Sequence, residues 1–102
     1  MTIKKDFFEI MEKQFGRLTV GKALKAWRLA EGLSQGPFAK RLGISVQSLC
    51  DLEKGRRVPT PARAAKMARK MGIPEISLIQ LALRDALFAE GFEFNVRLEK
   101  VS

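Results

Sequence analysis

The segment Leu33–Gly55, "LSQGPFAKRLGISVQSLCDLEKG", constrains the fold more than any other part of the chain. Its apolar spacing predicts two short helices, Gln35–Leu42 and Val46–Lys54. Ser34 and Ser45 stand directly before these helices, where serine commonly caps a helix N-terminus. Such a pair is either a structural elbow or a device that places one exposed helical face against a partner.

The dipeptide Gly36-Pro37 falls inside the first of these helices and could be expected to break it. With Ser34 as N-cap, however, the dipeptide occupies the second and third helical positions, where backbone amides have no intrahelical partner. Gly36 should still weaken the helix by somewhat under ~1 kcal/mol relative to alanine. Tertiary packing of three apolar side chains must therefore hold the helix: Phe38, Ala39 and Leu42.

Three further helices are expected on either side of this pair. Their predicted ranges are 20–31, after the N-cap Thr19; 61–71, which opens with Thr60-Pro61 and stops at Gly72; and 74–90, which opens at Pro74. We expect Trp27 to lie in the core of the first of them.

The last stretch, "FEFNVRLEK", changes from a helical to an alternating pattern, which is typical of a strand with one buried face. A lone strand edge leaves backbone groups unmet, so pairing with the same strand of a second copy is the expected solution. The strand could instead fold back on the N-terminal segment or add to a sheet in a partner protein. The predicted dimer interface consists of apolar residues of the last helix and the strand: Ile79, Leu83, Leu87, Phe92, Phe94, Val96 and Leu98.

Composition makes an enzyme an improbable interpretation. The 102 residues suit one domain and include no histidine or tyrosine and a single cysteine. No phosphate-binding glycine loop and no cluster of metal ligands occurs, so we expect no catalytic residue, no metal and no cofactor. No run of 18 apolar residues is present, and one cysteine cannot form an internal disulfide. A cytoplasmic location without membrane contact is expected.

The positive charge is concentrated in the middle of the chain. The net charge is +8, and residues 19–72 hold twelve Lys or Arg against three Asp or Glu. A local excess of this sign suits a polyanion, with nucleic acid as the first candidate. A lysine-rich surface that only confers solubility is the alternative.

A helical wheel divides the helix Val46–Lys54 into two faces. The outward set is Val46, Gln47, Cys50, Asp51 and Lys54; the inward set is Ser45, Ser48, Leu49, Leu52 and Glu53. A serine cap, a glutamine and a helix N-terminus suit base edges and phosphates; a contact of Gln47 with a phosphate or a water is the less favoured alternative. Just beyond, Lys54, Arg56 and Arg57 could grip backbone phosphates.

These features resemble a known family. Arg28, "GLSQ", "FA", "LGIS", "SL", "LEKG" and Pro59 look like the helix-turn-helix domain of the phage-repressor and Cro type, the XRE family, over about Lys22–Leu81. The resemblance implies an all-α fold: a five-helix repressor-like domain (19–90) with an N-terminal helical extension (1–18) and a short C-terminal β-strand (91–102), paired across a dimer. It also implies that the second helix of the pair enters the DNA major groove.

Site residues follow from that match. The implied base-facing residues are Val46, Gln47, Cys50 and Asp51, and the implied phosphate contacts are Gln35, Ser45, Ser48, Lys54, Arg56 and Arg57. Gln35 also matches a bracing position. The resemblance further implies a buried ion pair between Arg28 and Glu53, whose breakage on one side typically costs ~3–5 kcal/mol.

The sequence departs from the family pattern in two respects: at Pro37, and at two base-facing positions, often filled by Gln, Arg or Asn, that here hold Val46 and Asp51. Pro37 replaces the usual acidic residue, so there is no capping box. Val46 could pack on a thymine methyl, and Asp51 could accept a hydrogen bond from cytosine N4 or engage Arg56 instead. Cys50 is either a small tolerated side chain or an oxidation switch beside DNA.

The expected function is a homodimeric repressor that binds a palindromic operator in double-stranded DNA and regulates its own operon on a bacterial or phage nucleoid. The main alternative is an antitoxin, similar to HipB- or HigA-type proteins, whose chief task is to bind a toxin protein. A third is a nucleic-acid binder without sequence preference. The N-terminal extension would complete the core or bind a partner through Phe7, Phe8, Ile10, Met11 and Phe15.

Overall fold

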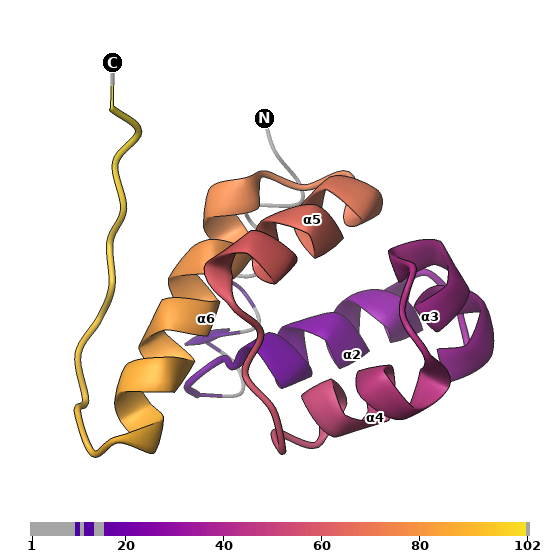
Figure 1. Cartoon of the computed structure of the whole chain (residues 1–102), viewed down its shortest axis with the longest axis horizontal. Helices are drawn as coiled ribbons and strands as arrows, with labels where there is room; N and C mark the ends of the chain where they lie inside the picture. The colour runs from indigo at the N-terminus through magenta and orange to yellow at the C-terminus, as the bar shows by residue number, and fades with distance from the viewer. Residues whose placement is uncertain (1–9, 11, 14–15, 102) are drawn as a thin grey trace.

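The computed structural model describes residues 10, 12–13 and 16–101 of the chain (Figure 1). Its helices are α2 (Val20–Ala30), α3 (Gln35–Leu42), α4 (Val46–Glu53), α5 (Pro61–Met71) and α6 (Glu75–Ala89). These five agree with the five predicted helices to within one residue at each end. Among the described residues of the extension, 10, 12 and 13 have helical backbone; Phe7, Phe8, Met11 and Phe15 lie outside the described residues.

Three of the four predicted side-chain caps form. Thr19, Ser45 and Thr60 each accept a hydrogen bond from the amide three residues later, at 3.0–3.2 Å. Ser34 is the N-cap residue of α3, as predicted, but its hydroxyl makes no capping bond. The amide three residues after Ser34 would belong to Pro37, which has no N–H, so the usual donor is missing.

The helices enclose one core. Helix α2 packs against α4 and α6, α3 packs against α4 and α5, and α5 packs along α6. The largest fully buried side chains come from all five helices: Phe38, Leu24, Leu42, Leu49, Met71, Leu78 and Val20. Trp27 is also buried, as predicted.

The contact between α2 and α4 depends on Gly21, which the sequence did not single out. A Cβ atom at Gly21 would lie 2.2 Å from the carbonyl oxygen of Leu52 and 2.9 Å from that of Glu53. Only glycine permits this approach of the two backbones. The absence of a side chain at Gly21 thus places the C-terminal end of α4 directly on the first turn of α2.

Helix α6 also fixes the start of α2. Asp85 accepts hydrogen bonds from the Val20 amide at 2.8 Å and from Arg17 Nη2 at 3.0 Å. Its neighbour Arg84 donates to Glu12 Oε2 at 2.6 Å and to the Leu18 carbonyl. This pair of residues joins α6 to the segment that leads into α2.

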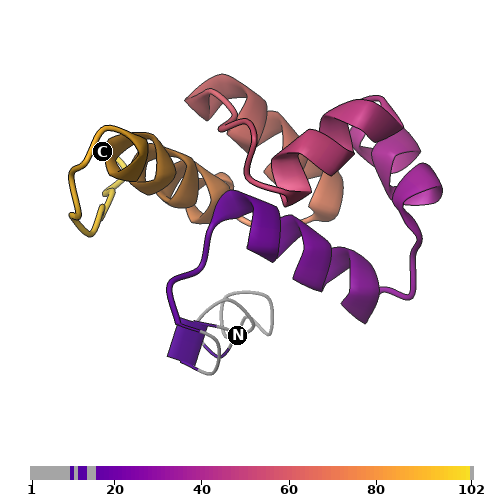
Figure 2. The ribbon, with the colours of Figure 1, turned by 90° about the horizontal axis from the view of Figure 1, so that it is seen from below.

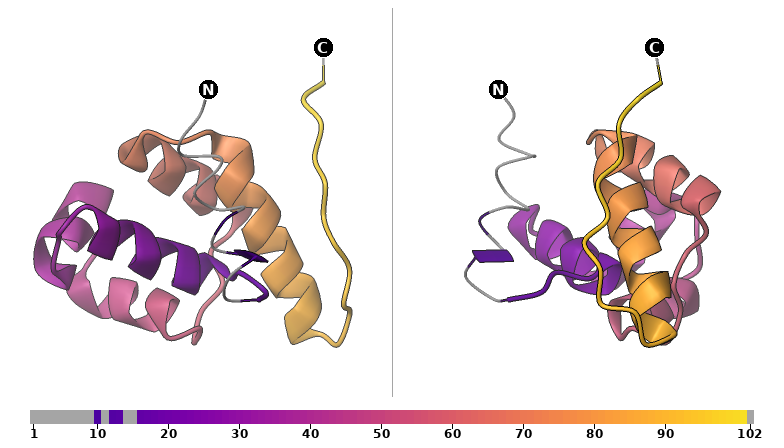
Figure 3. Two further views of the ribbon diagram at one scale, coloured as in Figure 1. Left: turned by 180° about the vertical axis from the view of Figure 1, so that it is seen from behind. Right: turned by 90° about the vertical axis from the view of Figure 1, so that its left-hand side faces the viewer.

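Residues 92–101, where a strand was predicted, form no strand within the described part of the chain. The segment runs extended beside α6 in the opposite direction (Figures 1 and 3). The Leu98 amide donates to Gln80 Oε1 at 2.8 Å. A side chain of α6 thus supplies a hydrogen-bond partner to the backbone of this segment. Pairing between two copies stays a prediction.

No helix in the part of the chain that the structure describes has the length and apolar character needed to cross a membrane.

Candidate nucleic-acid interface

Helices α3 and α4 form a compact helix–turn–helix. The turn uses Gly43, whose φ of 76° is a left-handed value that glycine adopts without strain. In Figure 1, α4 lies at the lower edge of the molecule, opposite the turn that joins α5 and α6. Figure 2 views the molecule from that lower side. The pair is therefore available to an external partner along α4.

The outward face of α4 matches the helical wheel. Val46 and Gln47 are exposed, with Val46 at 49%, whereas Leu49 and Leu52 are buried. Cys50 and Asp51 are half-buried at the next turn. The helix N-terminus thus presents an apolar and an amide side chain beside the Ser45 cap, while contact of these residues with bases stays a prediction.

Asp51 is bound within the protein. Gln47 Nε2 donates to Asp51 Oδ1 at 3.1 Å, and Arg56 Nη1 donates to the same oxygen at 3.2 Å. Arg57 Nε lies 3.9 Å from Asp51 Oδ2. The sequence left two roles open for Asp51, a hydrogen bond to cytosine N4 and a contact with Arg56. The structure shows the contact with Arg56.

The predicted ion pair between Arg28 and Glu53 is present and bidentate. Arg28 Nε donates to Glu53 Oε2 at 2.8 Å, and Nη2 donates to Oε1 at 3.0 Å. Arg28 Nη1 also donates to the Leu33 carbonyl at 3.1 Å. The hydrogen bonds with Glu53 raise the pKa of Arg28 above its ordinary value, although burial acts in the opposite direction. This pair clamps α2 to the end of α4.

Gln35 joins the same cluster. Its Nε2 donates to Glu53 Oε1 at 3.0 Å, which places Gln35 in the bracing role that the resemblance implied. The side chain is half-buried, and its predicted contact with phosphate would have to use the remaining amide atoms.

Cationic side chains border the outward face of α4. Lys54, Arg56 and Arg57 are exposed. A groove of about 190 Å³ lies beside them, between α4 and the start of α5. It is lined by Ser48, Leu52, Arg57, Val58, Pro59, Thr60 and Arg63. Thr60 and Arg63 line this groove but were not predicted as site residues, although the Thr60-Pro61 helix start was recognised; only the fold places that start next to α4.

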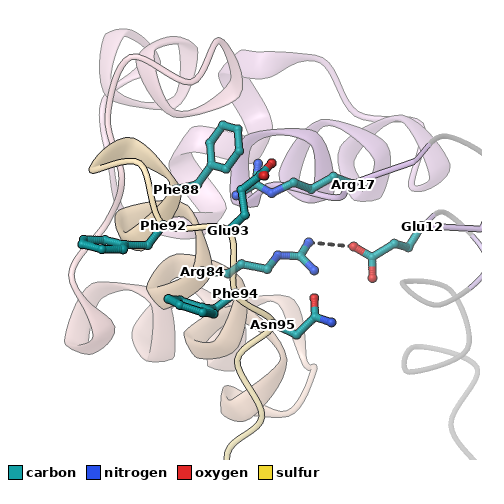
Figure 4. Close-up of a pocket in the computed structure, with 8 residues that line it drawn as sticks. All are labelled: Glu12, Arg17, Arg84, Phe88, Phe92, Glu93, Phe94 and Asn95. Carbon is teal, nitrogen blue, oxygen red and sulfur yellow. Dashed lines mark hydrogen bonds and ion pairs between the residues drawn. The ribbon is translucent and has the colours of Figure 1, made fainter.

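A second cavity, of about 320 Å³, lies at the far end of α6 (Figure 4). Three of its four charged lining residues have partners in the protein: Arg84 binds Glu12, and Arg17 binds Asp85 and lies 4.1 Å above the Phe88 ring. Within the described residues, therefore, this cavity offers few free charges to a ligand. No group of three His, Cys, Asp or Glu residues in the same described ranges is placed to hold a metal ion.

The carboxylates near this cavity have shifted pKa values. Burial raises the pKa of Asp85 above 3.8, although the Val20 amide and Arg17 act to lower it. Burial also acts to raise the pKa of Glu12, but the hydrogen bonds from Arg84 and the Leu18 amide prevail and lower it below 4.5.

The residues of the predicted dimer interface fall into two groups. Phe92 and Phe94 are exposed, at 49% and 62%, and their rings stack with centroids 6.2 Å apart. The other five are half-buried on α6 or against it: Ile79, Leu83, Leu87, Val96 and Leu98. Phe88, which the sequence did not single out, is also exposed and lines the same cavity as the stacked pair. The structure thus brings three phenylalanines together on the surface at the end of α6.

A family model described as helix-turn-helix matches residues 24–78. The uncharacterized HTH-type transcriptional regulator YazB of Bacillus subtilis is 45% identical over 42 residues, which are 41% of this chain and 61% of YazB. The uncharacterized regulator y4dJ of Sinorhizobium fredii, also HTH-type, is 35% identical over 63 residues, 62% of this chain and 82% of y4dJ. No solved structure matches. The chain belongs to the XRE-type helix-turn-helix family of DNA-binding proteins.

Proposed function

We propose that the protein is a sequence-specific transcriptional repressor that binds a palindromic operator as a homodimer. The observation that carries this proposal is the outward face of α4, where exposed Val46 and Gln47 follow a formed serine cap and precede three exposed cations. The HTH-type transcriptional regulators to which the chain is similar support it.

In this proposal the N-terminal turn of α4 enters the major groove. Val46 packs on a thymine methyl and Gln47 bonds a base edge, contacts that distinguish base pairs. Lys54, Arg56, Arg57 and Arg63 bind phosphates, which supply affinity and fix the register without reading sequence. The buried clamp between Arg28 and Glu53 holds α4 at a fixed angle, so the reading face is formed before DNA binds.

We further propose that α6 and residues 92–98 form the dimer interface. Exposed phenylalanine rings at this surface are unfavourable in water and suit a second copy of the same apolar segment. Two reading helices about 34 Å apart would then match successive major grooves on one side of the duplex. Occupation of an operator by the dimer would block transcription, including that of its own operon.

Dimerisation is tested by sedimentation of Phe94→Lys. A charge in the interface should convert the dimer to a monomer. Leu29→Lys is the matched control, since Leu29 is 59% exposed on α2. A Phe94→Lys protein that sediments like the wild type would contradict the proposed interface.

The same three phenylalanines favour one alternative, an antitoxin that docks a toxin protein there. Two results together would support the antitoxin. The protein alone would be a monomer, and Phe94→Lys would abolish its capture of one defined partner encoded beside it. A stable dimer of the chain alone supports the repressor.

Selection of bound duplexes from a random pool, at about 0.15 M salt where nonspecific binding is weak, tests the reading of sequence. The proposal predicts a palindrome with half-sites about 10 base pairs apart or a multiple of that. Recovery of no shared motif would overturn it and leave a nucleic-acid binder without sequence preference.

A further inference from the structure

We infer that Asp51 does not read a base but is a positioning residue that sets the base preference of Gln47. This inference rests on the proposed function and deepens it. Asp51 lies four residues after Gln47, one helical turn away on the same face of α4. The Gln47 Nε2 to Asp51 Oδ1 distance of 3.1 Å joins the two side chains directly.

The chemistry of the pair determines which way the glutamine amide faces. An ionised carboxylate only accepts hydrogen bonds, so Asp51 faces the NH₂ end of Gln47 and excludes the carbonyl end. One N–H and the Oε1 atom of Gln47 remain free for a partner. A donor beside an acceptor matches adenine, which offers N7 as acceptor and N6 as donor in the major groove. The preferred base opposite Gln47 is therefore adenine.

Asp51 itself is poorly placed to contact a base. Its side chain is only 17% exposed, and Arg56 donates to the same oxygen that Gln47 uses. Arg57 approaches the other oxygen at 3.9 Å. A cytosine N4 group would have to displace these cations, so the carboxylate acts through its neighbours.

The same contacts moderate nonspecific binding. Arg56 and Arg57 are 58% and 65% exposed, and both are partly neutralised by Asp51. Loss of the carboxylate charge would strengthen the contacts of both arginines with phosphates of any sequence. Asp51 thus favours sequence discrimination over affinity, because it orients the Gln47 amide and because it weakens nonspecific contacts of the two arginines.

Asp51→Asn tests this role, because asparagine keeps the shape but can both donate and accept, so that either end of the Gln47 amide can face it. In random-pool selection, the preference for adenine at one base pair of each half-site should fall at least about fivefold. Binding to random-sequence DNA should tighten, with a salt slope steeper by about one for each arginine that gains a phosphate contact. Glu75→Gln is the control: it removes the same charge and frees Arg69 at the α5–α6 turn, away from α4 (Figure 1).

A double-mutant cycle separates positioning from direct reading. In a Gln47→Ala background, Asp51→Asn should cause no further change in base preference. A further change in base preference at a separate base pair would make Asp51 a reader and overturn the inference. An Asp51→Asn protein that selects the wild-type motif with wild-type discrimination would also overturn it. If the wild-type chain itself selects no motif, the proposed function fails as well, so the two failures are distinguishable.

Discussion

Arg28 on α2 and Glu53 at the end of α4 are joined by two parallel hydrogen bonds of 2.8 and 3.0 Å, with side chains only 10% and 4% exposed. Gln35 from α3 donates to the same carboxylate. One buried acid therefore connects the helix-turn-helix pair, α3 and α4, to α2. Because these partners satisfy the charges, the pair fixes the angle of α4 without leaving an unpaired ion in the core.

Removal of Glu53 should be severe. Glu53→Ala leaves the Arg28 guanidinium buried without its partner and should lower the free energy of unfolding by about 3–5 kcal/mol in urea denaturation. Glu31→Ala is the control, because Glu31 pairs with Arg41 in solvent and its loss should cost at most about 1 kcal/mol. Equal losses in the two variants would contradict the account of the clamp.

Two glycines in helices should respond very differently to alanine. Gly21→Ala places a methyl group against the Leu52 carbonyl, so α4 must move and both stability and DNA affinity should fall. Gly36→Ala meets no atom beyond its chain neighbours, and the gain in helix propensity is offset by the ring of Pro37, so the free energy of unfolding should change by less than about 1 kcal/mol. Thermal melting of both variants checks this; a Gly21→Ala protein as stable as the wild type would refute the close approach.

The caps give a graded prediction. Thr60→Ala removes a formed cap and should cost about 1 kcal/mol of unfolding free energy. Ser34→Ala should cost almost nothing, since its hydroxyl makes no capping bond. Chemical denaturation of the two variants side by side tests this, and a loss at Ser34 as large as that at Thr60 would show that its hydroxyl caps α3 after all.

The acid limit of stability should contain two opposing contributions. Asp85 has a raised pKa, so the folded chain holds this proton more tightly than the unfolded chain does. Its contribution to stability is complete below pH 3.8 and is lost as pH rises through the raised pKa. The free energy of unfolding of the wild type minus that of Asp85→Asn should therefore fall with rising pH over this window.

Glu12 provides the opposite sign, because its pKa is lowered. Its contribution is complete above pH 4.5 and is lost as pH falls through the lowered pKa. Wild type minus Glu12→Gln should thus rise with pH where wild type minus Asp85→Asn falls. Urea denaturation at several pH values between about pH 3 and about pH 6 measures both differences in the free energy of unfolding. If both differences changed with pH in the same direction, the opposite pKa shifts of Asp85 and Glu12 would be contradicted.

The helices and their ends were predictable because their signals are local. Thr19, Ser45 and Thr60 cap as their positions suggest, and the glycines after the helices mark their ends. The outward placement of Val46 and Gln47 followed from helical geometry alone. The Arg28–Glu53 pair required the family resemblance, since 25 residues separate its members in the sequence.

The remaining features depend on contacts between distant segments. The need for glycine at position 21 arises from a carbonyl of α4, and Asp85 gains its role only when α6 meets the first turn of α2. The contact of residues 92–101 with α6 includes a hydrogen bond to the Gln80 side chain, which the alternating pattern of the tail does not reveal. The missing capping bond at Ser34 is different, because its cause is local. Pro37 has no N–H, so the sequence itself shows that the usual donor is absent.

The most direct test of the account is an NMR titration of the isotope-labelled protein with a duplex selected from the random pool. The account predicts that the largest changes in amide chemical shift fall at residues 45–57, the N-terminal turn of α4 and the cations after it. Residues 92–98 should change little, because they lie on a different surface. Large changes at residues 92–98 with α4 unaffected would contradict the claim that α4 is the DNA-reading element.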